Sequence, residues 1–500
     1  MKKINKKDIA IFIALLCFSL IIFTGYIKGH FAADTFRIIN IGYKNYAIEY
    51  SLVDGRIFMA IIGMLAYKVN LPITQYINML DILAIIVTCI DVIILKNIVL
   101  NYKKIDKKWQ NIFLIIVCYY TIFNFTYFEN MYFVECFVMS LSILFYILAT
   151  KEIIKKDKKS YLKGTIYLFL GLISYQGTIS AFFIFAILFS MLSEKSAKDM
   201  AKDFIKAICL FFIGFLLNNT CIILTEKIFD VTQTRGLNIS QIFKNIGFII
   251  NNCLRVLTYT ANLFPKYLYI IFIILISLFV TVKIVKQNSK QYSKKNQIIE
   301  LEQFIIIVFS IVFAFIPSVI NLTGFWSARM RFSIGASIGL LFIHLIVKTN
   351  ILEVKTKWDK ILIGIFILYG IINSINYIHL IYLNKQVNKL DEELVYQIDN
   401  YIKEYEGKED IKVENICVVI KQHETNKAYY SQMNCTNVGT AVSSVRTEWA
   451  AQGIINYYTN KNLKKQVLTK ENREKYIMNV DNNKNYLCID NTLYISVYMY

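Results

Sequence analysis

The chain has 500 residues, of which 56% are hydrophobic and 15% are aromatic, and its mean hydropathy is +0.47. A soluble protein of this size cannot bury so much apolar surface, so the composition excludes a soluble enzyme, a disordered chain and a secreted disulfide scaffold. The net charge of +20 does not indicate a nucleic-acid partner, because the lysines lie in short clusters between long apolar runs. The composition predicts a polytopic α-helical membrane protein.

The N-terminus is a lysine-rich segment, Met1–Asp8, followed by the apolar run Ile9–Ile27. This run is longer than the apolar part of a typical signal peptide and lacks a small-x-small exit. We therefore predict an uncleaved first membrane span.

Residues 28–75 are predicted to form the first outer loop, which holds the densest polar set: His30, Asp34, Arg37, Glu49, Asp54, Gly55 and Arg56. Asp34 follows the first span closely, so a lipid-borne substrate would reach it, and its carboxylate is a candidate general base. Arg37 lies three residues on, so the two would share a helical face. The alternative is a surface ion pair, which contributes little.

Further spans are expected wherever about 20 apolar residues follow one another. Including the first, nine segments qualify: 9–27, 76–95, 109–127, 131–150, 204–224, 266–286, 301–320, 332–348 and 360–380. The uncharged stretch between Lys163 and Glu194 predicts two short spans that meet outside near Ser174–Thr178, which gives about 11 spans. Arg56–Asn70 and Phe243–Phe264 are predicted to be amphipathic helices on the outer face instead.

Lysine clusters set the predicted orientation. They are the N-terminal tail and residues 96–108, 151–163, 195–206, 283–295 and 348–360, which together hold 28 Lys and no Arg. The positive-inside rule then places the N-terminus in the cytoplasm and residues 384–500 outside. The membrane domain is predicted to cover 1–383.

Residues 384–500 are predicted to form a small extracytoplasmic α/β domain. The pattern indicates an amphipathic helix at Asn384–Glu406 and strands at Ile411–Ile420 and Tyr486–Tyr498, with helices near 445–458 and 461–478. Cys417, Cys435 and Cys488 allow at most one disulfide. We expect this domain to recognise an acceptor or to cover the site.

The chain has eight arginines, and all of them fall in segments predicted to lie outside: Arg37, Arg56, Arg235, Arg255, Arg329, Arg331, Arg446 and Arg473. The planar guanidinium binds two phosphate oxygens at once, which lysine cannot do. Arginine kept to one side therefore indicates an anionic ligand there. The alternative is pairing with lipid head groups or loop carboxylates.

Several other side chains near the outer face are candidates for substrate binding. They are Glu129, Glu135, Tyr175, Gln176, Trp326, Arg329 and Arg331. Glu135 is expected several residues inside a span, where an ionisable group indicates function. Trp326 between potential anion contacts suits a sugar phosphate, and it also suits an interfacial aromatic belt. Asp81 and Asp91, within the second span, are expected to be structural rather than a proton relay.

Familiar nucleotide and metal motifs are absent. The sequence has no phosphate-binding loop, no Gly-x-Gly-x-x-Gly, no His-Glu-x-x-His and no Asp-x-Asp. Ten scattered Cys and four separated His give no support for a zinc site. No cofactor is predicted, although a divalent metal stays open, and a donor for any transfer reaction would arrive in the membrane.

These features, taken in order, resemble the Gtr type II glucosyltransferase family, of the GT-C class of membrane glycosyltransferases. The matching residues are Ala33-Asp34-Thr35-Phe36-Arg37, Tyr46, Asp54-Gly55-Arg56-Ile57-Phe58-Met59 and Ser174-Tyr175-Gln176. The resemblance covers most of residues 1–380. Family members often carry two adjacent acids where Ala33-Asp34 stands, so Asp54 or Glu129 is a candidate second acid.

The resemblance implies transfer of a sugar, glucose in the family, from a polyprenyl-phosphate donor to a surface glycan acceptor outside. Asp34 would be the catalytic base, Arg37 and Arg56 would be site residues, and the reaction would invert the anomeric centre. The abundance of Lys, Ile and Asn is typical of an AT-rich bacterial genome, so we expect a bacterial plasma membrane. Alternatives are a glycan polymerase or ligase, a flippase for lipid-linked sugars, and a non-enzymatic anchor.

Overall fold

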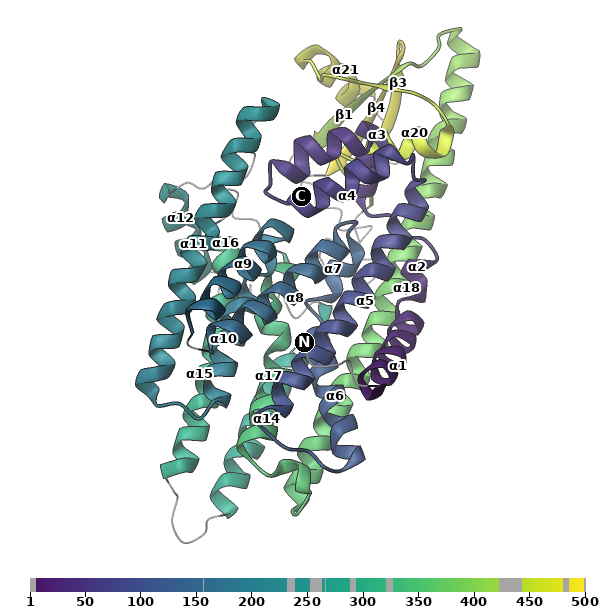
Figure 1. Cartoon of the computed structure of the whole chain (residues 1–500). Coiled ribbons are helices and arrows are strands. Elements are labelled where there is room, and N and C mark those ends of the chain that lie inside the picture. Colours follow the sequence, from purple (N-terminus) through teal and green to yellow (C-terminus); the bar gives the residue numbers. More distant parts are fainter. Residues whose placement is uncertain are drawn as a thin grey trace.

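The computed structural model describes residues 6–155, 157–231, 239–251, 263–265, 267–287, 294–320, 327–421, 443–479 and 485–498. Long helices run side by side through most of the molecule, and a small sheet with two helices lies at one end (Figure 1). The predicted combination of a helical membrane part and a C-terminal α/β part is confirmed at this level.

The first half of the chain is helical. Its helices are α1 (Lys6–Ile22), α2 (Thr24–Ile27), α3 (Ala33–Tyr46), the π-helix η1 (Ala47–Leu52), α4 (Ile57–Lys68), α5 (Ile73–Leu100), α6 (Lys108–Ile122), α7 (Phe128–Tyr132), α8 (Cys136–Ile153), α9 (Lys158–Ser174), the 3-10 turn η2 (Gln176–Thr178), α10 (Ser180–Leu192), α11 (Ala197–Phe229) and α12 (Ile239–Asn251).

The second half continues the bundle and ends in the sheet. Its elements are α14 (Leu268–Gln287), α15 (Lys294–Ala314), α16 (Ile316–Ile320), the 3-10 turn η4 (Ala328–Arg331), α17 (Phe332–Lys348), the 3-10 turn η5 (Ile351–Glu353), α18 (Lys357–Glu409), β1 (Asn415–Lys421), α20 (Ala451–Thr459), β2 (Lys464–Gln466), α21 (Lys470–Asn479), β3 (Tyr486–Ile489) and β4 (Thr492–Tyr498).

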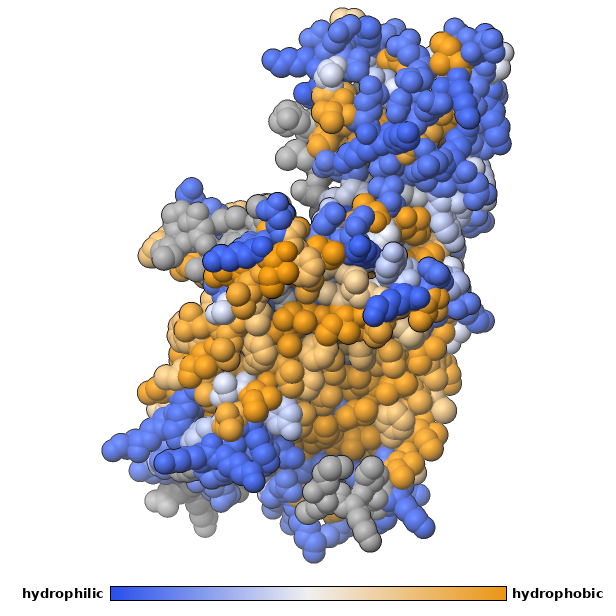
Figure 2. Space-filling view, turned by 45° about the horizontal axis from the view of Figure 1, so that its top comes forward, coloured by the Kyte–Doolittle hydropathy of each residue, from blue (hydrophilic) through white to orange (hydrophobic). Residues whose placement is uncertain are grey.

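Six stretches of the described residues are long and apolar enough to cross a membrane by length and composition. They are Ile73–Leu100, Cys136–Ile153, Ala197–Phe229, Lys294–Val319, Ala328–Lys348 and Lys357–Glu409. The surface carries an apolar belt between two polar ends, as expected for helices that face lipid (Figure 2). Both features indicate a membrane protein. The other predicted spans fall on α1, α6, α9, α10 and α14.

Helix α17 lies at the centre of the bundle, and every residue from Phe332 to Ile346 is buried. Gly335 and Gly339, four residues apart, allow this close packing. A Cβ atom on Gly339 would lie 2.0 Å from the Thr121 hydroxyl oxygen on α6. Small residues at this spacing let two membrane helices approach each other closely. Tight packing here fixes the start of α17, which directly follows η4.

The segment predicted to be the first outer loop folds into α3, η1 and α4, which lie across the end of the bundle beneath the sheet (Figure 1). The prediction of an amphipathic helix at Arg56–Asn70 is wrong in one respect. Helix α4 is apolar on both faces, because it buries Met59 and Ala60 while exposing Ile61 and Leu65. An apolar surface on all sides is typical of a buried helix or of one that faces lipid.

Helix α18 crosses the predicted domain boundary. It runs unbroken for 53 residues, from the Thr356–Asp359 capping box to Asp410 in the left-handed conformation. It extends along the bundle and reaches the sheet (Figure 1). The boundary at 383/384 therefore falls inside one helix. The sequence changes there from apolar to polar, but it contains no proline that would end the helix.

The sheet has the strand order β2-β1-β4-β3. Strand β1 runs parallel to both neighbours, and β3 pairs antiparallel with β4, so that Cys488 lies opposite Leu493. The single strand predicted at Tyr486–Tyr498 is thus a hairpin that turns at Asp490 and Asn491, two residues that favour turns. Cys417 and Cys488 are both free and buried, and Cys435 lies outside the described residues.

The C-terminal domain packs directly on α3. Ala33 and Phe36 share an apolar core with Val395 of α18 and with Ile454 of α20. A Cβ atom on Gly453 would lie 2.1 Å from the backbone oxygen of Phe36, so α20 touches the α3 backbone. The helix that carries Asp34 is therefore held between the bundle and the C-terminal domain.

Candidate functional site

Predicted site residues from distant parts of the chain gather where α3, η1, η2, η4, α7 and α8 meet. We call this group the outer cluster. It comprises Asp34, Arg37, Tyr46, Tyr50, Asp54, Arg56, Glu129, Glu135, Tyr175, Gln176, Arg329 and Trp449. The stacked rings of Tyr46 and Tyr50, with centroids 5.6 Å apart, join the part around Asp34 to the part around Arg56, and the other connections are described below.

Arg56 lies at the centre of the outer cluster. Its Nη2 atom is 3.2 Å from Asp54 Oδ2, and its Nη1 atom is 3.1 Å from Glu135 Oε1. Its guanidinium also lies 5.3 Å from the centre of the Tyr175 ring. Burial alone would lower the pKa of Arg56, but Asp54 and Glu135 raise it above its ordinary value, so the side chain stays charged.

The turn before Arg56 is fixed by Gly55, whose φ of 73° favours glycine. The Gln176 side-chain amide donates to the backbone oxygens of Asp54 at 3.0 Å and Gly55 at 3.3 Å. A Cβ atom at Gly55 would lie 2.8 Å from that same nitrogen. Gln176 therefore connects the tip between α9 and α10 to the first outer loop, two segments that the sequence predicted to be outside.

Glu135 accepts two donors on the same oxygen, because the Tyr46 hydroxyl lies 2.7 Å from Oε1. Burial, followed by the charges of Glu135 and Asp34, raises the pKa of Tyr46 well above its ordinary value, so the phenol remains a donor. The expectation that Glu135 lies inside a span is wrong: it is the residue before α8, since the short helix α7 delays the start of that helix. Its buried carboxylate is balanced by Arg56.

Glu129 holds the start of η4. Its Oε2 atom accepts hydrogen bonds from the Ser327 hydroxyl at 2.9 Å and from the backbone N–H of Arg329. The Arg329 guanidinium lies 3.8 Å from the centre of the Phe133 ring, and its Nε donates to the Tyr175 hydroxyl at 3.1 Å. Arg56 and Arg329 thus both contact Tyr175, and each also neighbours a buried glutamate.

Three predicted site residues are not part of the outer cluster. Arg331 is fully buried, and its guanidinium is 5.6 Å from the centre of the Phe315 ring. Arg235 and Trp326 lie outside the described residues, as does Arg255. Their predicted roles stay predictions.

Asp34 and Arg37 project from the first turns of α3 toward the C-terminal domain. The Trp449 indole N–H donates to Asp34 Oδ1 at 3.0 Å. The Arg37 guanidinium lies between two rings, 4.5 Å from the centre of Tyr50 and 5.0 Å from that of Trp449. Trp449 was not predicted from the sequence, because nothing near position 449 marks it as a site residue. Tyr46 was predicted only as one of the residues that carry the family resemblance.

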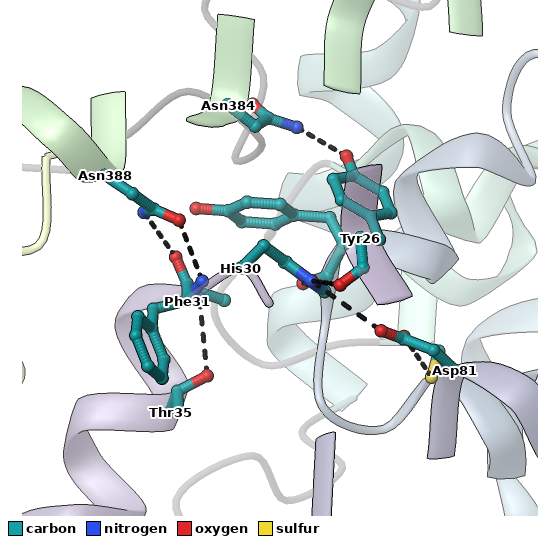
Figure 3. Close-up of polar contacts among 10 residues, drawn as sticks. Tyr26, His30, Phe31, Thr35, Asp81, Asn384 and Asn388 are labelled. Atoms are coloured by element: carbon teal, nitrogen blue, oxygen red, sulfur yellow. Dashed lines mark hydrogen bonds and ion pairs between the residues drawn. The ribbon is translucent and has the colours of Figure 1, made fainter. Parts of the chain in front are cut away.

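The link between α2 and α3 is held by a second polar group, shown in Figure 3. Here His30 stacks on Tyr26, with ring centroids 4.2 Å apart, and its Nδ1 atom is 3.7 Å from Asp81 Oδ2. Its Nε2 atom contacts the Tyr132 backbone oxygen at 2.9 Å. His30 thereby joins the segment that leads to Asp34 to the segment that leads to Glu135.

Helix α18 holds the same link from the other side. The Asn388 side chain exchanges two hydrogen bonds with the backbone of Phe31, each of 2.8 Å, and Asn384 donates to the Tyr26 hydroxyl (Figure 3). Asp81 also accepts a hydrogen bond from the Cys136 thiol at 3.4 Å. The contacts with His30 and Cys136 agree with the structural role that the sequence favoured for Asp81.

Because His30 is buried, we expect the free energy of unfolding to fall in acid. Burial lowers the pKa of His30 from 6.5 to about 4. A base whose folded pKa lies below its unfolded value stabilises the fold above pH 6.5, and that contribution is lost as the pH falls toward 4. Between pH 7 and pH 5 the protein should lose about 2 kcal/mol of unfolding free energy through this residue.

Thermal unfolding in detergent at pH 7 and pH 5 measures this loss. His30→Gln should show a smaller fall in midpoint between the two pH values than the parent, whatever its stability at pH 7. His379→Gln, at an exposed position of α18, is the matched control and should retain the parent's pH dependence. An equal fall in the parent and His30→Gln would contradict the prediction.

The outer cluster combines fixed cations with partly exposed acids. Asp34, Arg37, Asp54, Arg56 and Arg329 are half-buried, whereas Glu129 and Glu135 are buried. Arginines held in place by buried carboxylates form a preorganised site for an anion. A partly exposed carboxylate close by can accept a proton. Within the described ranges, no group of three His, Cys, Asp or Glu side chains is arranged to hold a metal ion.

Comparison with known proteins adds no relative. No protein-family model matches the sequence, and none of the curated proteins matches it.

Proposed function

We propose that this chain is a membrane glycosyltransferase of the GT-C class with about 11 spans. It transfers a sugar from a polyprenyl-phosphate donor to a surface glycan, and the family resemblance implies that this sugar is glucose. The reaction takes place on the outer side of a bacterial plasma membrane, with the N-terminus in the cytoplasm and the C-terminal domain outside.

One observation carries the proposal. Asp34, Arg37, Asp54, Arg56, Glu129, Glu135, Tyr175, Gln176 and Arg329 were selected from sequence alone, and they join one outer cluster although they come from six separate segments. Side chains chosen for unrelated structural reasons would be scattered over the surface of the bundle. Their assembly supports a single site for a substrate that is both anionic and rich in hydroxyl groups.

The proposed chemistry uses Asp34 as the general base. An acceptor hydroxyl attacks the anomeric carbon on the side opposite the phosphate, and its proton passes to the Asp34 carboxylate. The new C–O bond forms as the bond to the phosphate oxygen breaks, and polyprenyl phosphate leaves as the anion. The anomeric centre is inverted. Asp54 and Glu129 are the candidates for a second acid.

Arg56 and Arg329 are assigned to the donor phosphate. Both guanidinium groups contact Tyr175, and both are only partly covered. Charge that develops on the leaving phosphate is stabilised most strongly by donors that are already in position, because they need no reorganisation during the reaction. Glu135 and Glu129 supply this fixed placement.

The test compares the mass and sugar composition of the surface glycan in three strains: the parent, a deletion, and the deletion rescued with Asp34→Asn. We expect one hexose per repeat to disappear in the deletion and to stay absent with Asp34→Asn, while immunoblotting shows the variant in the membrane. An intact repeat with shorter chains would favour a polymerase or ligase. Accumulated lipid-linked precursor would favour a flippase, and full rescue would remove Asp34 as the base.

A further inference from the structure

The C-terminal domain contributes a side chain to the proposed base. Trp449 precedes α20 and donates its indole N–H to Asp34 Oδ1 at 3.0 Å. Its ring also covers the Arg37 guanidinium at 5.0 Å. Residues 415 positions apart in the sequence therefore meet at the carboxylate on which the proposed reaction depends.

The position of Trp449 is set by rigid packing. Helix α20 touches the α3 backbone at Gly453, and the side chain of Asn40 donates to Gln452 at 3.0 Å. The Phe36 ring packs against Tyr457 and Tyr458, with centroids 6.1 and 6.3 Å away. These contacts hold the first turns of α3 against α20, and Trp449 lies two residues before α20, so the backbone that carries the indole is fixed close to Asp34.

We propose that Trp449 is a positioning residue for Asp34, and that the C-terminal domain thereby completes the active site. This inference rests on the proposed function, in which Asp34 accepts the proton. A hydrogen bond to a carboxylate stabilises its ionised form and fixes the orientation of the group. The indole N–H does both, and it adds no charge beside Asp34 and Arg37.

The ionisable groups around Asp34 affect its protonation, which is the quantity that would report the loss of this hydrogen bond. Arg37 lies one turn along α3, and Tyr46 of the same helix interacts electrostatically with Asp34. Beyond Tyr46 lie Glu135 and Arg56, which carry opposite charges. Trp449→Phe changes none of these charges and keeps an aromatic ring at position 449. A change in the protonation of Asp34 would then report the indole N–H.

The experiment replaces Trp449 in the full-length protein and follows two signals across pH 4 to 8. The first is transfer of labelled glucose from polyprenyl-phosphate glucose to surface glycan isolated from the deletion strain. The second is labelling of Asp34 by a carbodiimide, which reacts with protonated carboxyl groups and is read by peptide mass. In Trp449→Phe we expect both midpoints to rise by about one pH unit, since a hydrogen bond to a charged group is worth about that much.

Two further variants separate positioning from simple support of the fold. Benzothienylalanine at position 449 keeps the shape of the two rings but lacks the N–H, and it should reproduce the shift. Trp109→Phe, at the exposed start of α6, is the matched control and should leave both midpoints unchanged. Unshifted labelling in both Trp449 variants, or faster transfer at every pH, would overturn the inference.

The two signals also distinguish this inference from the proposed function. If the parent protein transfers no glucose but Asp34 labelling still shifts in the Trp449 variants, glucose transfer fails as the function while the contact between Trp449 and Asp34 stands. If transfer is normal and no midpoint moves, the function stands and the role of Trp449 is wrong.

Discussion

Replacing Arg56 by alanine is expected to lower the rate of sugar transfer by about two orders of magnitude, the usual cost of removing one preorganised donor to a developing negative charge. The same change leaves the buried Glu135 with the Tyr46 hydroxyl and without its cation. Breaking a buried pair from one side costs about 3 kcal/mol of stability. The variant should therefore lose both activity and thermal stability.

Arg56→Lys separates the effect on activity from the effect on stability. It retains the positive charge beside Asp54 and Glu135 and should recover most of the thermal midpoint, but it cannot form the planar fork that binds two phosphate oxygens. Transfer per folded molecule should stay at least tenfold below the parent. Arg473→Ala, on the exposed face of α21, is the matched control and should change neither quantity. Parental transfer by Arg56→Ala would exclude Arg56 from the phosphate site.

Gly453→Ala is expected to displace α20 relative to α3. The new methyl group would lie 2.1 Å from the Phe36 oxygen and 2.9 Å from its carbonyl carbon. Both are backbone atoms, so one helix has to move. Such overpacking costs about 1–3 kcal/mol. A displacement of about 1 Å at a reacting group can lower a rate by about 100-fold, so transfer should fall sharply.

Gly407→Ala is the matched control for this change. Gly407 lies near the end of α18, and a Cβ atom there meets nothing within 4 Å. Alanine favours a helix over glycine by about 1 kcal/mol, so this variant should be as stable as the parent or slightly more so. Thermal midpoints and the rate of proteolysis at the α18–β1 junction measure both variants. Equal behaviour of the two would contradict the close contact between α20 and α3.

Local patterns predicted much of the fold. Apolar runs and lysine clusters located the helices, and the break at Ser174–Thr178 is confirmed as the turn between α9 and α10. The helix that contains the last predicted span continues far beyond it, because hydropathy reports where a helix leaves an apolar environment and says nothing of where the helix ends. Asn384 and Asn388 therefore looked like the start of a soluble domain, although they continue α18.

The acidic and arginine members of the outer cluster were predictable because such groups rarely lie beside apolar helices without a function. Trp449 was not predictable from the same reasoning. Trp449 is a candidate only because the fold brings it close to Asp34. In the sequence, a tryptophan in a polar segment looks like any partly buried aromatic side chain. The pairing of His30 with Asp81 was missed for the same reason, since each residue alone suggests only packing.

The geometry of the site depends on the angular positions of three side chains around the axis of α18. Asn384 and Asn388 hold the link before α3, and Asp391, one turn further, accepts hydrogen bonds from the Ser443 hydroxyl and the Ser444 N–H. The three residues lie on one face of the helix, so a single helix about 80 Å long sets the position of the C-terminal domain relative to α3. One inserted residue between Asn388 and Asp391 would turn the sheet by about 100° relative to α3. Homologous chains should therefore vary in length at the lysine-rich turns and keep a constant spacing along this face.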